Sequence, residues 1–262
     1  MKRYGVVAAL FVLSMITYID RVCISTAKDP IAHSLGFSDA QMGLVFSAFS
    51  LGYALAQIPS GWLADRFGPR LALAAVVSAW SLLTALTGAA WSLASMLVIR
   101  FLFGVGEAGA FPGSARAFVN WLPPGERGAA NGILFSGSRI GAAFAFPLLV
   151  FMIERWEWRL SFVILGFAGL VWAAFWLAWF RDHPDQPPPP APVAPGAAIS
   201  LRDVFRTTAF VPAMIQYFAG NFTFYICLTW MLPYLKRQYR LSDAEAAAYA
   251  MAPLLVGAVS QW

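Results

Sequence analysis

The sequence GWLADRFGPR at residues 61–70 is the most informative stretch of the chain. It places one aspartate and two arginines between two long apolar stretches, residues 40–63 and 71–91. Each apolar stretch is close to the 20 or so residues that a helix needs to cross the hydrocarbon core of a bilayer. The stretch therefore predicts a short polar loop between two membrane-spanning helices, which its arginines hold on the cytoplasmic side.

The composition of the whole chain agrees with this prediction. Of 262 residues, 60% are hydrophobic and 12% are charged, and the mean hydropathy is +0.65. Soluble domains contain about 45 to 50% apolar and about 25% charged residues, so a soluble globular fold is excluded. The aromatic content of 16% excludes a disordered chain. We expect an all-α, polytopic membrane protein.

Eight apolar stretches are long enough to be membrane-spanning helices. They cover residues 4–26, 40–63, 71–91, 93–118, 129–153, 160–180, 211–235 and 246–262. The first is predicted to be a retained helix rather than a signal peptide, because it lacks a clear small-residue cleavage site.

A proline-rich connection divides these spans into two groups. We expect residues 1–180 to form a six-helix bundle, residues 181–210 to form a cytoplasmic linker, and residues 211–262 to form two further helices. Within the linker, residues 185–195 are predicted to be extended, and residues 199–210 to form a short amphipathic helix capped by Ser200. The last span has no polar flank, so we interpret the chain as a C-terminally incomplete part of a longer membrane protein.

The distribution of basic residues predicts the orientation. Nine Lys and Arg residues fall on the side of the N-terminus and six on the other side, which places the N-terminus in the cytoplasm. We expect the protein to lie in the inner (plasma) membrane. The net charge of +5 is spread thinly, so no nucleic-acid partner is expected. The two cysteines are predicted to be apolar packing residues, and we expect no metal and no cofactor.

The loop at residues 61–70 resembles the signature of the major facilitator superfamily between its second and third helices. The matching residues are Gly61, Asp65, Arg66, Gly68 and Arg70, and the main departure is Pro69, where the family usually has a basic residue. Gly61 allows close helix approach, and Asp65 carries a charge at a helix end.

Further motifs resemble the anion:cation symporter branch, which holds hexuronate, aldarate and aldonate transporters and the animal sialic acid and vesicular glutamate carriers. They lie at residues 18–21, 100–112, 125–128, 137–141 and 230–234. A departure is Cys23, where many members have Asn. The resemblance implies two bundles with the substrate between them near the midplane, alternating access by rocking, and a monomer when full length.

Five ionisable residues lie in or near the predicted spans: Asp20, Arg21, Arg100, Glu107 and Arg139. Each costs about 2.5 to 3.5 kcal/mol at a helix centre, so we expect these side chains to face one another or a water-filled cavity. Seven residues separate Arg100 from Glu107, nearly two helical turns, so both project from one face of their helix.

Three arginines against two acids favour an anion in such a cavity. We predict proton-driven symport of an organic anion, a sugar acid such as a hexuronate, aldonate or aldarate. Asp20 and Glu107 carry protons, while Arg21 and Arg100 alternate between pairing with these acids and holding the substrate. The resemblance implies the same roles, and it also implies Tyr18, Tyr53 and Ser138 as contacts to substrate hydroxyls.

Structural interpretations of these charges stay open at this point. Asp20 and Arg21 could form a boundary pair at the outer helix end, and Arg100 and Glu107 could form a structural ion pair. Arg139 could line the pathway, or it could bind backbone carbonyls and tighten the spans.

Other functions are also open. A drug:proton antiporter shares the loop signature, but a charged Asp20-Arg21 pair suits anions better than lipophilic cations. An intramembrane hydrolase would need a nucleophile with a base. Both histidines, His33 and His183, lie in predicted loops and no Gly-x-Ser-x-Gly elbow is present, so we expect no enzyme. A non-transporting receptor, scaffold or fragment is a further alternative, and we expect residues 1–262 alone to fold the first bundle without transporting.

Overall fold

The computed structural model describes residues 3–184 and 201–260, and all regular secondary structure in these ranges is α-helical. The helices in chain order are α1 (Arg3–Thr26), α2 (Lys28–Leu35), α3 (Asp39–Thr87), α4 (Leu93–Glu107), α5 (Ala110–Trp121), α6 (Pro124–Trp179), α7 (Leu201–Arg206), α8 (Phe210–Tyr239) and α9 (Asp243–Val259). The predicted all-α class is confirmed.

Two helices are too long for a single membrane crossing. α3 has 49 residues and α6 has 56, and at about 1.5 Å per residue each exceeds twice the roughly 30 Å thickness of the hydrocarbon core. α3 breaks at Gly68 (φ 78°, ψ 154°) and α6 breaks at Glu157 (φ 61°, ψ 165°). Each therefore supplies two crossings, at the positions where the sequence predicts separate spans.

The predicted fourth span, residues 93–118, is divided into two helices. α4 ends at Glu107 and α5 begins at Ala110, with a turn at Ala108 and Gly109 between them. Glycines at 104, 106, 109 and 113 lower the helix propensity of this segment, which gives the interruption a physical reason.

Serine side chains begin three of the helices. Ser38 before α3, Ser92 before α4 and Ser242 before α9 each accept a hydrogen bond from the backbone N–H three residues later. The side chain at that later position bonds back to the serine N–H, which completes a capping box. These caps fix the turns at one end of the bundle.

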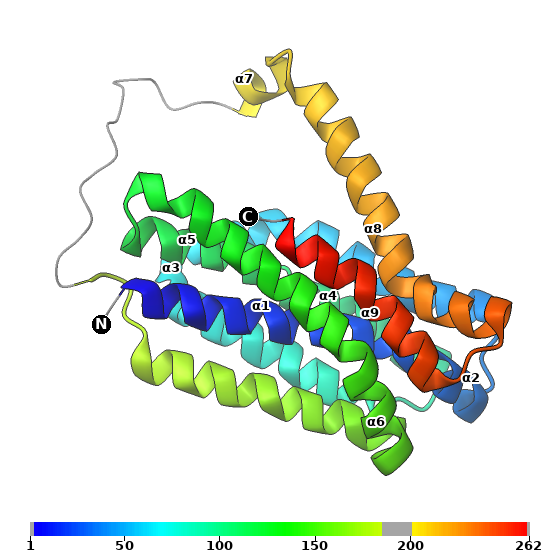
Figure 1. Cartoon of the computed structure of the whole chain (residues 1–262). Coiled ribbons are helices and arrows are strands. Elements are labelled where there is room, and N and C mark those ends of the chain that lie inside the picture. Colours follow the sequence, from blue (N-terminus) through cyan, green and yellow to red (C-terminus); the bar gives the residue numbers. More distant parts are fainter. Residues whose placement is uncertain (1–2, 185–200, 261–262) are drawn as a thin grey trace.

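Lateral packing joins helices that are distant in sequence. α3 packs along α4, α1 packs along α6, and α9 lies on α6. Figure 1 shows α8 leaning away from the other helices at its N-terminal end and approaching α2 and α9 at its C-terminal end. The interior between α1, α3, α4 and α8 holds the ionisable residues considered below.

Large apolar side chains cover the outside of this helical assembly. Ile58, Phe167 and Trp91 are 86%, 67% and 76% exposed, a pattern that suits contact with lipid. Four helical stretches of the described chain are long and apolar enough to cross a membrane, namely α1, α3, Leu93–Trp121 and α6. α8 and α9, the last two predicted spans, are not among these four. The chain is a multi-pass membrane protein.

The linker is only partly described. The proline-rich stretch at 185–195 and the predicted cap Ser200 lie outside the described residues. Of the predicted amphipathic helix at 199–210, α7 is helical only over Leu201–Arg206, and a turn at 207–209 leads into α8. Phe205 of α7 is exposed and packs edge-on against Phe210 with ring centroids 4.8 Å apart.

Candidate functional site

The loop between the two halves of α3 is anchored by Asp182, which follows α6. The backbone N–H of Arg70 donates to Oδ1 of Asp182 at 2.8 Å, and the Arg70 guanidinium donates to the carbonyl of Leu177 at 2.6 and 3.1 Å. Gly68 has φ 78°, and a Cβ there would lie 2.8 Å from the Asp182 carboxyl group. Glycine at this position permits both the turn and the anchor.

Residues 61–67 of the predicted loop are helical in the structure, and the chain turns at Gly68; we keep the name 61–70 loop for this segment. Its other residues make weaker contacts. Asp65 lies 3.7 Å from Arg116 of α5, and both side chains are well exposed. The Arg66 guanidinium stacks on Trp62 at 5.1 Å from the ring centroid. Gly61 faces α5, since a Cβ there would lie 3.7 Å from Cβ of Pro112. The loop is thus attached to α5 and to the end of α6.

A buried ion pair connects α1 to α4. Nε of Arg21 donates to Oε1 of Glu107, and the two side chains are only 3% and 0% exposed. Arg21 does not pair with its neighbour Asp20, so the boundary-pair interpretation does not describe this structure. A pair this well shielded from water is held by strong Coulombic attraction, and separating it leaves two buried charges.

Aromatic side chains surround the Arg21 guanidinium. It lies 4.4 Å from the ring centroid of Tyr53, 4.8 Å from that of Tyr18 and 5.4 Å from that of Phe49. Its Nη1 donates to the Tyr225 hydroxyl of α8 at 2.9 Å. Ring faces stabilise a cation without neutralising it, so this setting leaves Arg21 able to bind an anion.

Arg100 is buried at 1% exposure without a carboxylate partner. No Asp or Glu of the described residues lies within 4.0 Å of its guanidinium nitrogens. Its guanidinium packs on Phe103 at 4.3 Å and on Phe49 at 5.4 Å, so one Phe49 ring contacts both arginines. The alternative of a structural Arg100–Glu107 ion pair is therefore not what the structure contains, because Glu107 is paired across to α1.

Asp20 points toward the second half of α3. Its Oδ2 accepts a hydrogen bond of 3.1 Å from Nε1 of Trp80, and its backbone carbonyl accepts from Sγ of Cys23 at 2.8 Å. Asp20 is 1% exposed, so its carboxyl group is shielded from water. The indole N–H of Trp80 is the donor that takes the place of water at Oδ2.

Five polar atoms of these four side chains are buried with no hydrogen-bond partner among the described residues. They are Asp20 Oδ1, Arg21 Nη2, Arg100 Nε, Arg100 Nη1 and Glu107 Oε2. A buried polar atom left unsatisfied costs about 1 to 3 kcal/mol, and such atoms are uncommon outside functional sites. Asp20, Arg21, Arg100 and Glu107 are called the central charge cluster below.

Close contact between α3 and α4 brings this cluster together. A Cβ on Gly52 would collide with the carbonyl of Phe101, and a Cβ on Gly104 would collide with the carbonyl of Phe49 and lie 2.8 Å from the Tyr53 nitrogen. The two glycines lie reciprocally on the facing helices. Their missing side chains let the backbones approach and set Arg100 beside Phe49.

Ser138 and Arg139 lie on α6, at the edge of this region. The Ser138 hydroxyl donates to the carbonyl of Phe135 at 2.6 Å, so its proton is used within α6. Arg139 is half-buried, and its guanidinium lies 3.7 Å from the ring centroid of Phe224 of α8. Phe224 in turn packs on Tyr18, with ring centroids 6.1 Å apart.

A second group of charges lies at the opposite end of the bundle from the 61–70 loop. We call it the distal ion-pair cluster, and its members are Lys28, Asp29, Asp39, Lys236, Arg237 and Asp243. Lys28 lies 2.6 Å from Asp39, Lys236 lies 3.2 Å from Asp29 and 2.8 Å from Asp243, and Arg237 lies 2.9 Å from Asp39. These pairs tie α2 and the start of α3 to the ends of α8 and α9.

The ion pairs shift the pKa values of the distal cluster. Hydrogen bonds from Lys28 and Arg237 lower the pKa of Asp39 below its ordinary value of 3.8. Burial alone would raise the pKa of Asp29 and lower that of Lys236, but the hydrogen bonds and charges of their partners reverse both effects. Asp29, Asp39 and Lys236 are therefore charged throughout the neutral range.

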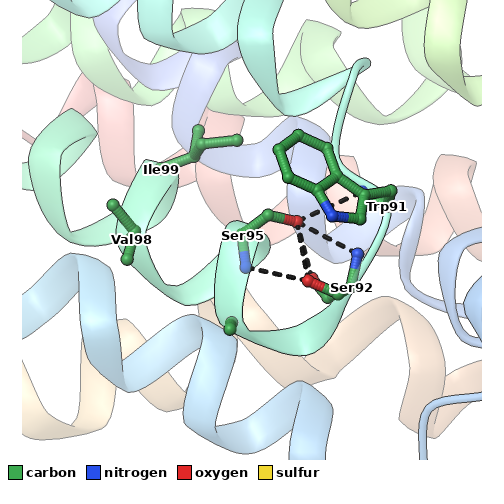
Figure 2. A pocket seen from close by; sticks show the side chains of 6 residues that line it. Trp91, Ser92, Ser95, Val98 and Ile99 are labelled. Carbon is green, nitrogen blue, oxygen red and sulfur yellow. Dashed lines mark hydrogen bonds between the residues drawn. The ribbon is translucent and has the colours of Figure 1, made fainter.

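A surface pocket at the start of α4 does not coincide with either cluster. Figure 2 shows Trp91, Ser92, Ser95, Val98 and Ile99 around it. The Ser92 and Ser95 hydroxyls are already used in the cap of α4. No group of three or more His, Cys, Asp and Glu side chains is placed to hold a metal ion anywhere in the described chain.

Several residues that shape the central cluster were not predicted from the sequence. Trp80, Phe49 and Phe103 supply the donor and the ring faces, and Asp182 anchors the loop. A detectable signal existed for Trp80, because its indole N–H lies inside a predicted span and needs an acceptor there. No such signal marks the phenylalanines, which are indistinguishable from packing residues in sequence.

Bent, lipid-facing helices around buried arginines and carboxylates define a polytopic membrane protein with a candidate functional site in its interior. Residues 10–262 match the family model of the Major Facilitator Superfamily, and the chain belongs to this superfamily.

Similar proteins place the chain within the organic-anion branch of the superfamily. It is 35% identical to a probable sulfoacetate transporter of Cupriavidus necator, over 98% of this chain and 63% of that protein. It is 31% identical to a hexuronate transporter of Bacillus subtilis, over 97% of this chain and 62% of that protein.

A solved structure has a closely similar fold. It is a bacterial homologue of the human lysosomal transporter Spinster in an inward-facing, unoccupied conformation, with a TM-score of 0.84 and 28% identity over 98% of this chain and 60% of that chain. The chain spans about 60% of the length of the proteins to which it is similar.

Proposed function

We propose that this chain takes part in proton-coupled symport of an organic anion by alternating access. The observation that carries the proposal is the buried Arg21–Glu107 ion pair beside an unpaired, buried Arg100. The central charge cluster has two arginines and two carboxylates, and the half-buried Arg139 at its edge gives the region an excess of one positive charge, which an entering anion neutralises. The similarity to sulfoacetate and hexuronate transporters supports an organic acid as the substrate.

Coupling follows from the two oxygens of Glu107. Oε1 accepts the hydrogen bond from Arg21, while Oε2 has no partner among the described residues and is the atom available to a proton. Protonation removes the negative charge that holds Arg21. The freed guanidinium then presents parallel N–H donors to a substrate carboxylate, which it binds through two hydrogen bonds.

The remaining residues position the substrate and carry a second proton site. The Tyr53 and Tyr225 side chains flank Arg21 and offer hydroxyl groups to a polyhydroxy acid, and Tyr18 covers the guanidinium from another side. We assign Arg100 to the anion as well, because Nε and Nη1 are unused. Asp20 is the second proton carrier, with Trp80 as the donor that stabilises its ionised form.

The distal ion-pair cluster is proposed to close the site from the side opposite the 61–70 loop. It joins α2 and α3 to α8 and α9, helices that the predicted domain division puts in different bundles. We also propose that the N-terminus is cytoplasmic and that the protein lies in the inner (plasma) membrane. Fold similarity to an inward-facing structure supports closure at the end opposite the 61–70 loop.

Uptake by proteoliposomes reconstituted with the product of the complete gene tests the proposal. With an inward proton gradient, radiolabelled glucuronate, galactarate or sulfoacetate is expected to accumulate, and a protonophore is expected to abolish accumulation. Accumulation that follows a sodium gradient and ignores the protonophore would contradict proton coupling. Uptake of a lipophilic cation in place of every acid would contradict the anion assignment.

A further inference from the structure

Arg139 differs from the other arginines at half-buried positions. Arg159 donates to the carbonyls of Gly88 and Ala90, both at 2.8 Å, and Arg127 donates to those of Leu122 and Val119. Arg139 forms no hydrogen bond to a carbonyl and no ion pair with a carboxylate in the part of the chain that the structure describes. A role in tightening the spans through backbone carbonyls is therefore not what its contacts show.

The position of Arg139 is close to the central charge cluster but on another helix. Its guanidinium lies 3.7 Å from the Phe224 ring, which lies 6.1 Å from the Tyr18 ring, which lies 4.8 Å from the Arg21 guanidinium. Two aromatic rings thus separate Arg139 from Arg21. Beyond it lies α9, because a Cβ on Gly257 would reach 4.0 Å from Cδ of Arg139.

The formal charges of this region decide which ligand it suits. Arg21, Arg100 and Arg139 carry three positive charges, and Asp20 and Glu107 carry two negative charges, which leaves an excess of one positive charge. One coupling proton raises the excess to two. A monoanion neutralises the region only without the proton, whereas a dianion neutralises it together with one proton.

We infer that the substrate is a short organic dianion and that Arg139 binds its second anionic group. Arg21, released from Glu107, holds the first group, and the rings of Tyr18 and Phe224 lie between the two guanidinium groups. The inference rests on the proposed function, since it takes the central charge cluster as the anion site. It adds the charge of the substrate and the residue that selects it.

Matched pairs of ligands test the inference without any variant. Galactarate and galactonate share one carbon skeleton and differ at one end, where the first has a carboxylate and the second a hydroxyl. Sulfoacetate and its carboxyl methyl ester form a second pair, in which the ester keeps the sulfonate and replaces the carboxylate by a neutral group. Binding to the purified chain in lipid nanodiscs is measured by calorimetry. We expect at least one dianion to bind about tenfold or more tightly than its monoanionic partner. Equal or weaker binding of the dianion would overturn the inference.

Substitution at Arg139 assigns the selectivity to this residue. In Arg139→Gln we expect dianion affinity to fall by about tenfold or more, with monoanion affinity changed by less than about threefold. Arg139→Lys retains the charge and is expected to keep part of the preference, and Arg155→Gln, at an exposed arginine, is expected to change neither affinity. An equal loss for both ligands, or no loss for either, would overturn the assignment. If no member of either pair binds the wild-type chain, the proposed function itself fails.

Discussion

Arg21 of α1 and Glu107 of α4 form an ion pair that is almost wholly excluded from water, although 86 residues separate them in sequence. The pairing leaves Arg100, on the same helix as Glu107, without a carboxylate. An arginine held by an acid and an arginine left unpaired within one cluster are the two elements that a proton-coupled anion site requires.

Glu107→Gln is expected to separate anion binding from pH. Glutamine cannot ionise, so Arg21 stays available at every pH, and between about pH 6 and 9 the affinity for galactarate should depend less on pH than in the wild type, with Asp20 as the remaining proton carrier. At the alkaline end we expect binding about tenfold tighter than in the wild type. Glu126→Gln is the control, because Glu126 pairs with Arg3 at the far end of the bundle. A wild-type pH profile in Glu107→Gln would contradict the role of Glu107.

Arg100→Gln is expected to lower the affinity for the anion by about tenfold to a hundredfold. The cluster then loses a buried guanidinium whose Nε and Nη1 nitrogens have no partner among the described residues. Arg100→Lys keeps a charge but not the planar fork, and it should recover only part of the loss. Calorimetry in nanodiscs measures both, with the exposed Arg155→Gln as control. Normal affinity in Arg100→Gln would place Arg100 outside the site.

Gly104→Ala is expected to destabilise the chain by about 1 to 3 kcal/mol, because its Cβ meets the backbone of the facing helix at Phe49 and Tyr53. The same substitution at Gly43, where no atom lies within 4 Å of the added Cβ, should be neutral or slightly stabilising. Thermal unfolding in detergent measures the difference. Equal melting temperatures for the two variants would show that α3 and α4 do not meet at Gly104.

Charge reversal in the distal ion-pair cluster is expected to open that end of the molecule. Cys23 is 1% exposed and lies near this end, so its alkylation by an impermeant thiol reagent reports opening in a Cys227→Ser background. Asp39→Arg and Arg237→Asp should each accelerate the reaction, and the double variant should restore much of the protection because the pair is re-formed in reverse. If the double variant accelerates the alkylation of Cys23 by the combined effect of the two single variants, the pair of Asp39 and Arg237 does not hold this end closed.

The pKa shifts give the same measurement a pH dependence. Because the pKa of Asp39 is lowered, its carboxylate stabilises the closed cluster fully at pH values above the ordinary pKa of 3.8. This stabilisation is lost as the pH falls through the lowered pKa of Asp39. Because the pKa of Lys236 is raised, its ammonium group stabilises the closed cluster fully at pH values below the ordinary pKa of 10.5. This stabilisation is lost as the pH rises through the raised pKa of Lys236. After correction for thiol ionisation, labelling of Cys23 should therefore be constant between about pH 5 and 9 and should accelerate only outside this window.

The helices and the members of the central charge cluster could be predicted from the sequence because the bilayer constrains both. Its thickness fixes the length of an apolar stretch, and its low polarity forces buried charges such as Asp20 and Glu107 to meet partners. Gly68 was also identifiable, since the motif places it at the break in α3 where φ is positive. These predictions depend only on local sequence and on the properties of the membrane.

The pairing within the cluster could not be predicted in the same way. The spacing of Arg100 and Glu107 suggests a pair on one helix, but contacts between helices decide which cation an acid meets. Here the close approach at Gly52 and Gly104 sets the two helices around Phe49. Similarly, the hydrogen bond from Trp80 to Asp20 joins helices that are adjacent only in three dimensions.

The number of protons taken up with each anion tests the coupling between Arg21 and Glu107 most directly. Galactarate is added to the purified chain in weakly buffered solution at neutral pH, and a pH-indicator dye records the protons bound. We predict that Glu107→Gln, which should still bind the ligand, takes up about one proton fewer per galactarate than the wild type. Binding of galactarate by the wild type without proton uptake, or unchanged uptake in Glu107→Gln, would contradict the account.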